Sequence, residues 1–271
     1  MSSSLGALLR LGWRSFRPTV AAYGLGSVSY VFLLMWLYPS IAHAPGLQAL
    51  LRTLPKSLVA STGLVAGLGS PLAYLTSEFY GTLYLWLLMI FTVVGIVRLI
   101  AQGPHRGSAG AWLAGPVSRP LWVLSQGGIF WGGLLITCGL VTAAEPVAMA
   151  IWEPQQVIPV GTLLLLNGMV VLVFTVLAGA VAVCAAAISD DQRALAVAAL
   201  FTMIQYVLSV VGGLTAGLAW MRRLSLFYWY RPAAIVLGAQ QLGFPSLVLL
   251  VMAMLLWGTA AWLFRRRDLL L

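Results

Sequence analysis

Long apolar runs, broken by short polar or charged stretches, fill the chain from about residue 19 to residue 264. A helix that crosses a bilayer needs about 20 mostly apolar residues. Six runs reach that length when they are trimmed at charged, proline, glycine and polar positions. The predicted spans are 19–41, 79–97, 121–144, 160–188, 194–218 and 245–264. The pattern therefore predicts an all-α integral membrane protein with six transmembrane helices.

One further run, Ser57–Ser77, carries no charge and is nearly long enough to be a seventh span. It contains Gly63, Gly67, Gly69 and Pro71, which weaken a helix that lies in lipid. We interpret it as an interfacial or re-entrant segment on the outer face, and a seventh span is the alternative. On this interpretation the two long outer segments are residues 42–78 and 219–244.

The composition excludes a soluble protein. Hydrophobic residues make up 61% of the 271 positions and charged residues only 8%, whereas a soluble domain has about 25% charged residues. The net charge of +9 is therefore attributed to basic loops at a membrane and not to nucleic-acid binding. Two cysteines and two histidines, far apart in the sequence, offer too few ligands for a metal site.

Six spans place both termini on the same side of the membrane. Ten arginines fall on that side, and only five basic residues fall on the other. Because cytoplasmic loops carry the excess of Lys and Arg, both termini are predicted to be cytoplasmic and the protein to lie in the cell membrane. The ten are Arg10, Arg14, Arg17, Arg98, Arg106, Arg119, Arg193, Arg265, Arg266 and Arg267.

The N-terminal segment, residues 1–18, has the pattern of an amphipathic helix. At 100° per residue, its large apolar side chains share one arc and its arginines share another. This predicts an interfacial helix on the inner leaflet, with its cations on anionic lipid headgroups. A simple anchor and a site that docks a partner both fit the pattern, and the two roles are compatible. The residues concerned are Leu5, Leu8, Leu9, Arg10, Trp13, Arg14, Phe16 and Arg17.

The cytoplasmic segment 98–120 contains three prolines, with room for one short helix at about 108–114. Trp112 and Leu113 are large apolar groups in a loop. Such groups either dip into the headgroups or enter a groove on another protein, and we favour contact with a partner. The candidate contact residues are Arg106, Gly107, Ser108, Trp112, Leu113 and Arg119.

Two sets of residues within the spans are candidates for function. Ser209, Gly213 and Gly217 recur every four residues, which suits close helix packing, either within one subunit or at a homodimer seam. Polar side chains in the spans are candidates for lining a pathway, although we favour hydrogen bonds between helices, or a place in an aromatic belt at the membrane interface, as the explanation of each. These are Tyr84, Asn167, Gln205 and Tyr206.

The chain lacks the motifs of several other functions. No acid or base falls within a predicted span, where ion-coupled transporters usually carry one. No catalytic motif of hydrolases or metalloproteases is present, and no catalytic residue is assigned. A P-loop is also absent, so any ATP that powers this protein must be bound by another chain.

Three features together resemble the permease subunits of ATP-binding-cassette (ABC) exporters of type 2. The loop that ends Leu113-Ala114-Gly115-Pro116-Val117-Ser118-Arg119 is similar to the family's G-x-L-x-x-L-L-x-x-P-[VI]-S-R stretch after the second span. Phe264-Arg265-Arg266-Arg267-Asp268-Leu269 is similar to its F-x-x-R-D-[LI] ending. The third feature is the layout of an amphipathic start, six spans and two long outer segments. The loop departs from the family in having no acid before its glycine.

The resemblance implies a homodimer with two copies of a cytoplasmic ATPase, which would bind ATP and Mg²⁺. Residues 106–119 would be a coupling helix in a groove of the ATPase, and Ser2–Arg17 an elbow helix. The path for an apolar or amphipathic cargo (a drug, peptide antibiotic, lipid or glycan) would follow the dimer axis along the second and fifth spans. A membrane scaffold or receptor for a cytoplasmic partner, or an unpowered channel, are the alternatives.

Overall fold

The computed structural model describes residues 2–42, 70–101, 118–155 and 159–266, in which helices are joined by turns and irregular chain. Six of its helices are long and apolar enough to cross a membrane, which confirms the prediction of six such helices in an all-α protein.

The elements are α1 (Ser2–Ala42), α5 (Pro71–Tyr74), η1 (Leu75–Leu83), α6 (Tyr84–Ile100), α9 (Arg119–Trp152), α10 (Val160–Ala187), α11 (Asp191–Leu214), η2 (Ala216–Leu218), α12 (Ala219–Leu224), η3 (Leu226–Trp229), α13 (Pro232–Val236) and α14 (Gly243–Arg266).

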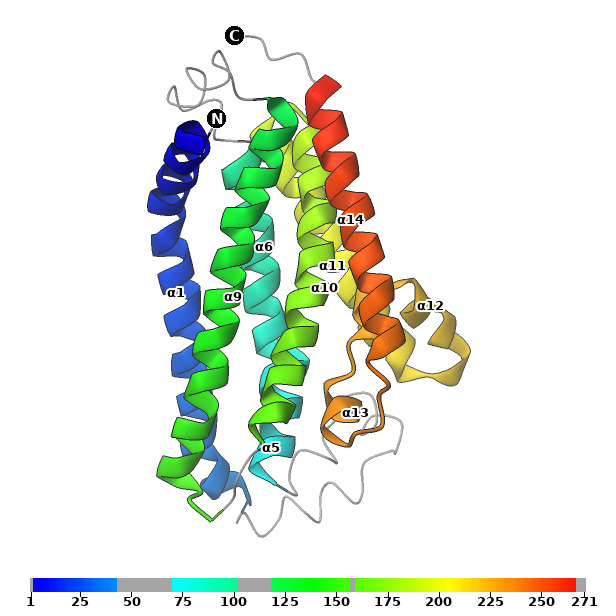
Figure 1. The fold of residues 1–271 in the computed structure, drawn as a ribbon. Coiled ribbons are helices and arrows are strands. Elements are labelled where there is room, and N and C mark those ends of the chain that lie inside the picture. The colour runs from blue at the N-terminus through cyan, green and yellow to red at the C-terminus, as the bar shows by residue number, and fades with distance from the viewer. Residues whose placement is uncertain (1, 43–69, 102–117, 156–158, 267–271) are drawn as a thin grey trace.

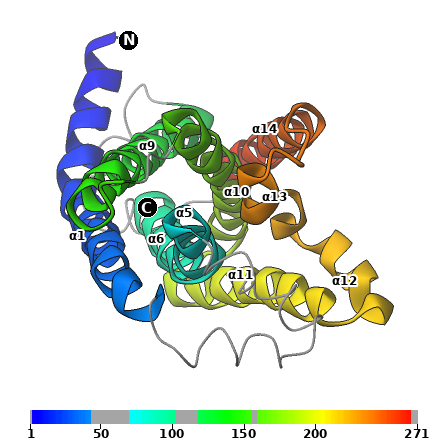
Figure 2. The same ribbon diagram turned by 90° about the horizontal axis from the view of Figure 1, so that it is seen from below.

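The long helices run up and down, so that the start of α1 and the end of α14 lie at the same end of the bundle (Figure 1). Seen along its axis, α6 occupies the middle, with α1, α9, α10 and α11 around it and α14 outside α10 (Figure 2). Helices α6 and α10 are therefore buried along most of their length, whereas α11 and α14 are largely exposed. We call the end with the start of α1 the terminal end and the other the distal end.

Helix α1 is a single helix of 41 residues that continues through Pro18. A separate interfacial helix was expected over residues 1–18, but no break marks its end. The apolar side of this segment packs on α9, because Phe16 is buried against Phe130 and a side chain at Gly12 would overlap Ile129. At 1.5 Å per residue α1 is about 60 Å long, twice the hydrocarbon core of a bilayer. Its first turns therefore extend beyond that core.

The second span begins at Pro71, earlier than the expected residue 79, and continues through α5, η1 and α6. Ser70 caps it, since the Ser70 hydroxyl accepts a hydrogen bond from the Ala73 amide, and Pro71 occupies the first helical turn. The end of the ambiguous run Ser57–Ser77 is thus part of this span. Residues 43–69 lie outside the described residues.

The third span, α9, is also longer than expected. It was predicted to end at Ala144, before Glu145, but the helix passes through Glu145 and Pro146 and ends at Trp152. The residues after Pro146 are apolar again, which allows the helix to remain in the membrane. Pro146 removes one backbone donor, but the helix tolerates this loss where neighbouring helices surround it. As a result, an acidic side chain lies inside the bundle.

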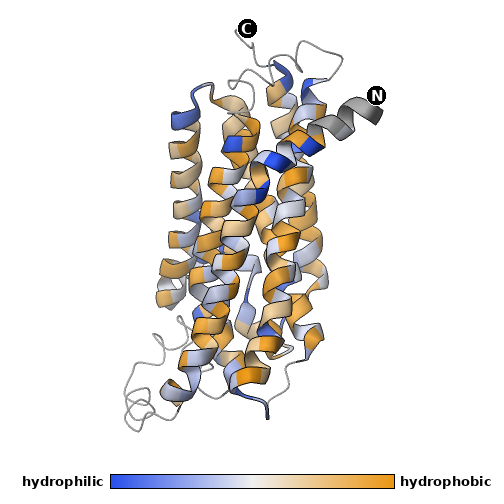
Figure 3. Ribbon diagram, turned by 90° about the vertical axis from the view of Figure 1, so that its left-hand side faces the viewer, coloured by the Kyte–Doolittle hydropathy of each residue, from blue (hydrophilic) through white to orange (hydrophobic). Residues whose placement is uncertain are grey.

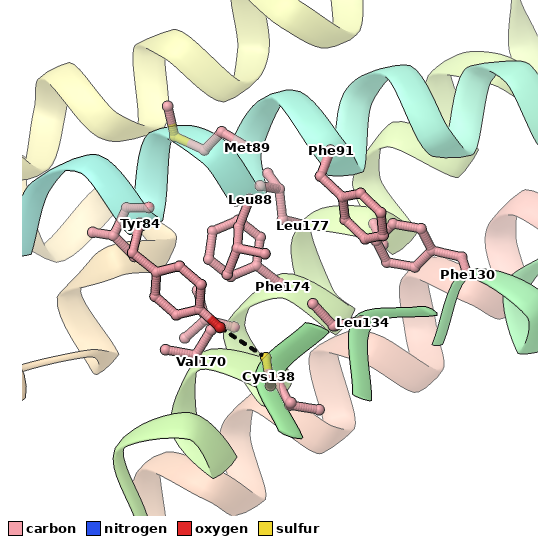
Figure 4. Packing of buried hydrophobic residues seen from close by; sticks show 14 of the residues in the cluster. Tyr84, Leu88, Met89, Phe91, Phe130, Leu134, Cys138, Val170, Phe174 and Leu177 are labelled. Carbon is pink, nitrogen blue, oxygen red and sulfur yellow. Dashed lines mark hydrogen bonds between the residues drawn. The ribbon is translucent and has the colours of Figure 1, made fainter. Parts of the chain in front are cut away.

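Three aromatic rings join α1, α6 and α9 near the middle of the bundle. The ring centroids of Phe16 and Phe91 are 5.4 Å apart, and those of Phe91 and Phe130 are 5.2 Å apart. Gly95 and Gly133 leave room for the Phe16 ring, because an added Cβ at either would lie 3.0 Å or less from it. Figure 4 shows Phe91 and Phe130 beside the aliphatic core. Glycines thus permit the close approach of these helices.

The chain between α11 and α14 turns back into the bundle. Its backbone is held well inside the distal end of α11. The Gln205 side-chain oxygen accepts the Leu226 amide at 2.9 Å, and the Gln205 carbonyl accepts the Ser225 hydroxyl at 2.6 Å. Phe227 is buried against Phe174 and Tyr206. Because side chains satisfy its backbone, this irregular chain can lie at membrane depth. We call residues 215–231 the re-entrant segment.

The outer surface of the bundle is suited to lipid. Apolar positions cover its length, and hydrophilic positions gather toward the two ends (Figure 3). Large side chains such as Leu25 and Trp36 on α1, Leu200 on α11 and Met254 on α14 are more than half exposed. In water such a surface would cause aggregation, whereas in a bilayer it is the expected surface of a spanning bundle.

Candidate functional site

A group of polar side chains lies buried between the second, third and fourth spans. We call Tyr80, Tyr84, Cys138, Glu145 and Asn167 the polar cluster, and each is at most 4% exposed. They come from η1, α6, α9 and α10. Polar groups are costly inside a membrane protein and usually mark a site of function or a specific contact between helices. This cluster is the strongest candidate site among the described residues.

Asn167 is at the centre of the hydrogen bonds in the cluster. Its side-chain Nδ2 donates to the Tyr80 hydroxyl at 2.5 Å and to the Leu163 carbonyl at 3.2 Å. The Tyr84 hydroxyl donates to the Cys138 sulfur at 3.2 Å and lies 3.4 Å from Asn167 Oδ1. Figure 4 shows the Tyr84 hydroxyl pointing at Cys138. Both contacts of Asn167 Nδ2 are thus hydrogen bonds, and its Oδ1 lies at the edge of the range of the Tyr84 hydroxyl.

Helix geometry explains why these residues meet. Asn167 lies seven residues after the start of α10 at Val160, and Glu145 lies seven residues before the end of α9 at Trp152. Both ends are distal, so at 1.5 Å per residue both side chains lie about 10 Å inside the bundle. Cys138 and Glu145 are seven residues apart, which places them on the same face of α9.

Glu145 differs from the other members of the cluster. It is fully buried, and its carboxyl oxygens make no hydrogen bond of normal geometry, although the Tyr80 hydroxyl interacts with them at longer range. The groups in electrostatic contact with it are Tyr80, Tyr84, Cys138 and Tyr230. None of these is a cation, so the described surroundings of Glu145 provide no ion pair.

The re-entrant segment contributes Tyr230 to the edge of the cluster. This side chain is 4% exposed, and its hydroxyl has no hydrogen-bond partner. The Tyr230 hydroxyl can donate a hydrogen bond. The cluster thus connects three spans with the re-entrant segment.

The side chains expected to line a pathway occupy three different positions. Tyr84 is fully buried and joins helices through the bonds described above. Gln205 holds the backbone of the re-entrant segment. Tyr206 is partly exposed, and its ring packs on Trp86 with centroids 4.9 Å apart. All three make contacts within one subunit, and the structure does not bring them together around one opening.

The three small residues predicted to recur along the fifth span, Ser209, Gly213 and Gly217, do not all lie on one helix. Ser209 and Gly213 are partly exposed on α11, but α11 ends at Leu214 and Gly217 lies in η2. The close approach within the subunit is made instead by Gly212, where an added Cβ would overlap the backbone of Arg222. This contact holds α12 against α11. Burial lowers the pKa of Arg222, and the neighbouring Arg231 lowers it further.

The candidate residues at the terminal end are partly described. Arg10, Arg14 and Arg17 are exposed on α1, and Trp13 is partly buried against the core. Arg119 is the first residue of α9 and is partly exposed. The predicted coupling residues Arg106, Gly107, Ser108, Trp112 and Leu113 lie outside the described residues.

Sequence reasoning missed Glu145, Tyr80 and Tyr230 as members of one site. Glu145 was placed just beyond the end of the third predicted span, and neither tyrosine was a candidate site residue. A signal was present in the run Val147–Trp152, which is apolar after the Glu-Pro pair and allows the helix to continue. No comparable signal places Tyr230, because its burial depends on the fold of the re-entrant segment.

No protein-family model matches this chain, and no curated protein matches it either. The conclusions about its class therefore rest on its own sequence and structure. Six long apolar helices, exposed apolar surfaces and polar groups buried between the helices are the features that define this class. The chain is a multi-pass, all-helical membrane protein.

Proposed function

We propose that this chain is the permease subunit of an ABC exporter of type 2, which moves an apolar or amphipathic cargo with ATP bound by a separate subunit. The observation that carries the proposal is the position of the loop with the family-like P-V-S-R ending. That loop joins Ala101 to Ser118, the ends of α6 and α9 at the terminal end, where α1 starts and α14 ends.

The basic residues at the terminal end support a cytoplasmic partner there. The described arginines of that end are exposed or partly exposed and outnumber those of the distal end. They are Arg10, Arg14, Arg17, Arg98, Arg119, Arg193, Arg265 and Arg266 at the terminal end, and Arg222, Arg223 and Arg231 at the distal end. The excess of positive charge favours a cytoplasmic location for the terminal end. An ATPase there would contact the segment 106–119 as a coupling helix and the start of α1 as an elbow helix.

The exposed faces of α11 and α14 support a second copy of the chain. Of the six candidate spans, α11 is the least buried within its own subunit. Two copies that meet along α11 would place the re-entrant segments beside the dimer axis, where they would close the path at the distal end. Movement of the ATPases would reach these segments through the rigid spans. Each step needs a contact that differs between two states of the complex.

The experiment is affinity purification of the tagged chain from native membranes in mild detergent, followed by identification of the proteins bound to it. We expect a stoichiometric ATPase, which is lost from the double variant Arg106→Ala with Trp112→Ala. Arg223→Ala at the distal end is the matched control and should retain the ATPase. A chain that purifies alone, or with a partner that has no ATPase activity, would refute the exporter proposal. The first result would favour a channel and the second a scaffold.

A further inference from the structure

The carboxyl group of Glu145 has an unusual environment for an acid. It lies in the third span about 10 Å inside the distal end, it is fully buried, and no hydrogen bond of normal geometry reaches either of its oxygens, with the Tyr80 hydroxyl interacting at longer range. An ionised carboxylate in apolar surroundings is stable only when a cation or several donors compensate for lost water. The group must therefore be compensated by something that binds there.

The neighbours of Glu145 identify what can compensate for it. The titratable groups that interact electrostatically with it are Tyr80 and Tyr84 from η1 and α6, Cys138 from its own helix, and Tyr230 from the re-entrant segment. The polar group of α10 at this level is the neutral amide of Asn167. Among the described neighbours there is thus no positive charge, but there are several hydroxyl groups.

The hydrogen bonds leave two of these hydroxyls available to Glu145. The Tyr80 oxygen accepts a bond from Asn167 Nδ2, so its own hydrogen remains free to donate. The Tyr230 hydroxyl has no partner at all. The Tyr84 hydrogen, in contrast, is directed at Cys138. Tyr80 and Tyr230 are therefore the groups that can hold a carboxyl group in place.

A metal ion fits these surroundings poorly. Hard cations such as Ca²⁺ and Mg²⁺ take about six or more oxygen ligands. The cluster has a single carboxyl group, and Asn167 Oδ1 lies against the Tyr84 hydroxyl. In the described part of the chain no three His, Cys, Asp or Glu residues are grouped to hold a metal. A proton needs no ligand shell and removes the charge altogether.

We propose that Glu145 is a proton-binding site inside the membrane domain, in which Tyr80 and Tyr230 are the hydrogen-bond partners of the protonated carboxyl group. The ligand is one proton, bound at a carboxyl oxygen. Tyr80 positions the group from the second span, and Tyr230 positions it from the re-entrant segment. Proton binding thereby favours the packing of that segment against the bundle. The proposal goes beyond the exporter function, because it holds whether or not an ATPase powers the protein.

The chain allows a direct test, because it has only three glutamates: Glu78, Glu145 and Glu153. Glu78 and Glu153 are partly exposed, so the double variant Glu78→Gln with Glu153→Gln should fold and leave Glu145 as the only glutamate. The purified protein would carry glutamate labelled with ¹³C at its side-chain carboxyl group. Infrared spectroscopy at neutral pH would then distinguish the carbonyl band of a protonated acid from the bands of a carboxylate.

We expect the protonated-acid band in the wild type and, at equal intensity, in the double variant. We expect its loss in Glu145→Gln, a nearly isosteric change that should keep the fold. A double variant that shows only carboxylate bands would overturn the proposal, and this result does not require Glu145→Gln to fold. The outcome is independent of the purification experiment, since it needs no ATPase.

The two proposed partners can be tested by the same band. Tyr80→Phe and Tyr230→Phe each remove one hydroxyl and keep the ring, so each should shift the carbonyl band to higher frequency as the acid loses a hydrogen bond. Tyr206→Phe is the matched control and should leave the band in place, because Tyr206 faces Trp86 and Phe227. A band that stays in place in both Tyr80→Phe and Tyr230→Phe would overturn the assignment of the partners.

Discussion

At the scale of single residues, the polar cluster shows how a few buried groups can select one arrangement of apolar helices. Apolar side chains pack on one another in many registers, and lipid tails compete with them equally well. Asn167 and Tyr84 remove this freedom, because their hydrogen bonds form in a single register of η1, α6, α9 and α10. Specificity of packing, more than net stability, is the expected contribution of these bonds.

The hydroxyl of Tyr84 provides a test at this scale. Tyr84→Phe keeps the ring stacked on Phe79 but removes the donor to Cys138 and Asn167. We expect a loss of about 0.5–1.5 kcal/mol in the free energy of unfolding, the usual range for one buried hydrogen bond. Thermal unfolding in detergent would measure this loss. Tyr206→Phe, which removes no such bond, should unfold like the wild type. Equal behaviour of the two variants would contradict the role given to Tyr84.

At the scale of elements, glycines determine which helix faces can approach one another. The side chains of Val20 and Phe16 from α1 occupy the space beside Gly133 on α9. At the adjacent Gly132, an added Cβ would have no neighbour within 4 Å. Gly127 and Gly179 similarly receive the ring of Trp257 from α14. The Trp257 indole then donates to the Thr175 carbonyl at 3.2 Å. Small residues on α9 and α10 thus hold α1 and α14 in place.

The pair Gly132 and Gly133 provides a matched comparison. Gly133→Val would place its side chain within the volume of Phe16 and Val20, so α1 should move away from α9 at a cost of about 1–3 kcal/mol. Gly132→Val adds the same side chain on the open face and should cost much less. Denaturation of the two variants in the same detergent would measure the difference. A Gly132→Val protein as unstable as Gly133→Val would contradict this packing.

At the scale of the whole molecule, the number of long helices and their apolar faces could be predicted from the sequence, because each needs only a long apolar run. The ends of the second and third spans could not be predicted. Their true ends lie beyond Glu78 and Glu145, and an acid is acceptable inside a span only where other helices surround it. The polar cluster depends on long-range contacts such as Tyr80 with Asn167, which no local pattern encodes. The exposed arginines of α1 follow directly from its amphipathic pattern.

The orientation in the membrane can be tested with two single cysteines in a variant that lacks Cys138 and Cys184. Gln192 is exposed in the first turn of α11 at the terminal end, and Ala239 is exposed at the distal end. A membrane-impermeant maleimide added to intact cells should label Ala239→Cys and leave Gln192→Cys unlabelled until the cells are lysed. The opposite pattern would place the terminal end outside and remove the support for a cytoplasmic partner.

Dimer formation along α11 belongs to the same scale. In the cysteine-free variant, Ser209→Cys should form a disulfide between two copies in native membranes under mild oxidation, because residues near a two-fold axis face their own symmetry mates. Leu25→Cys is the control, since Leu25 is 63% exposed on a different helix, α1, and it should remain monomeric. The two proteins would be compared on non-reducing gels. A monomeric Ser209→Cys protein would refute a seam at this position.

The π-helical turns of η1 have a consequence for how the chain tolerates a change in its length. The Tyr84 amide bonds to the Phe79 carbonyl, five residues earlier instead of four, so the second span carries a spare residue. Deletion of Gly81 would let this stretch close into an ordinary α-helix, and the protein should still elute as one symmetric peak in gel filtration. Deletion of Ile90, in regular α6, would rotate the part of the helix after the deletion by about 100° relative to the part before it. This change of register should abolish folding. The second span thus has a built-in site at which a residue can be gained or lost.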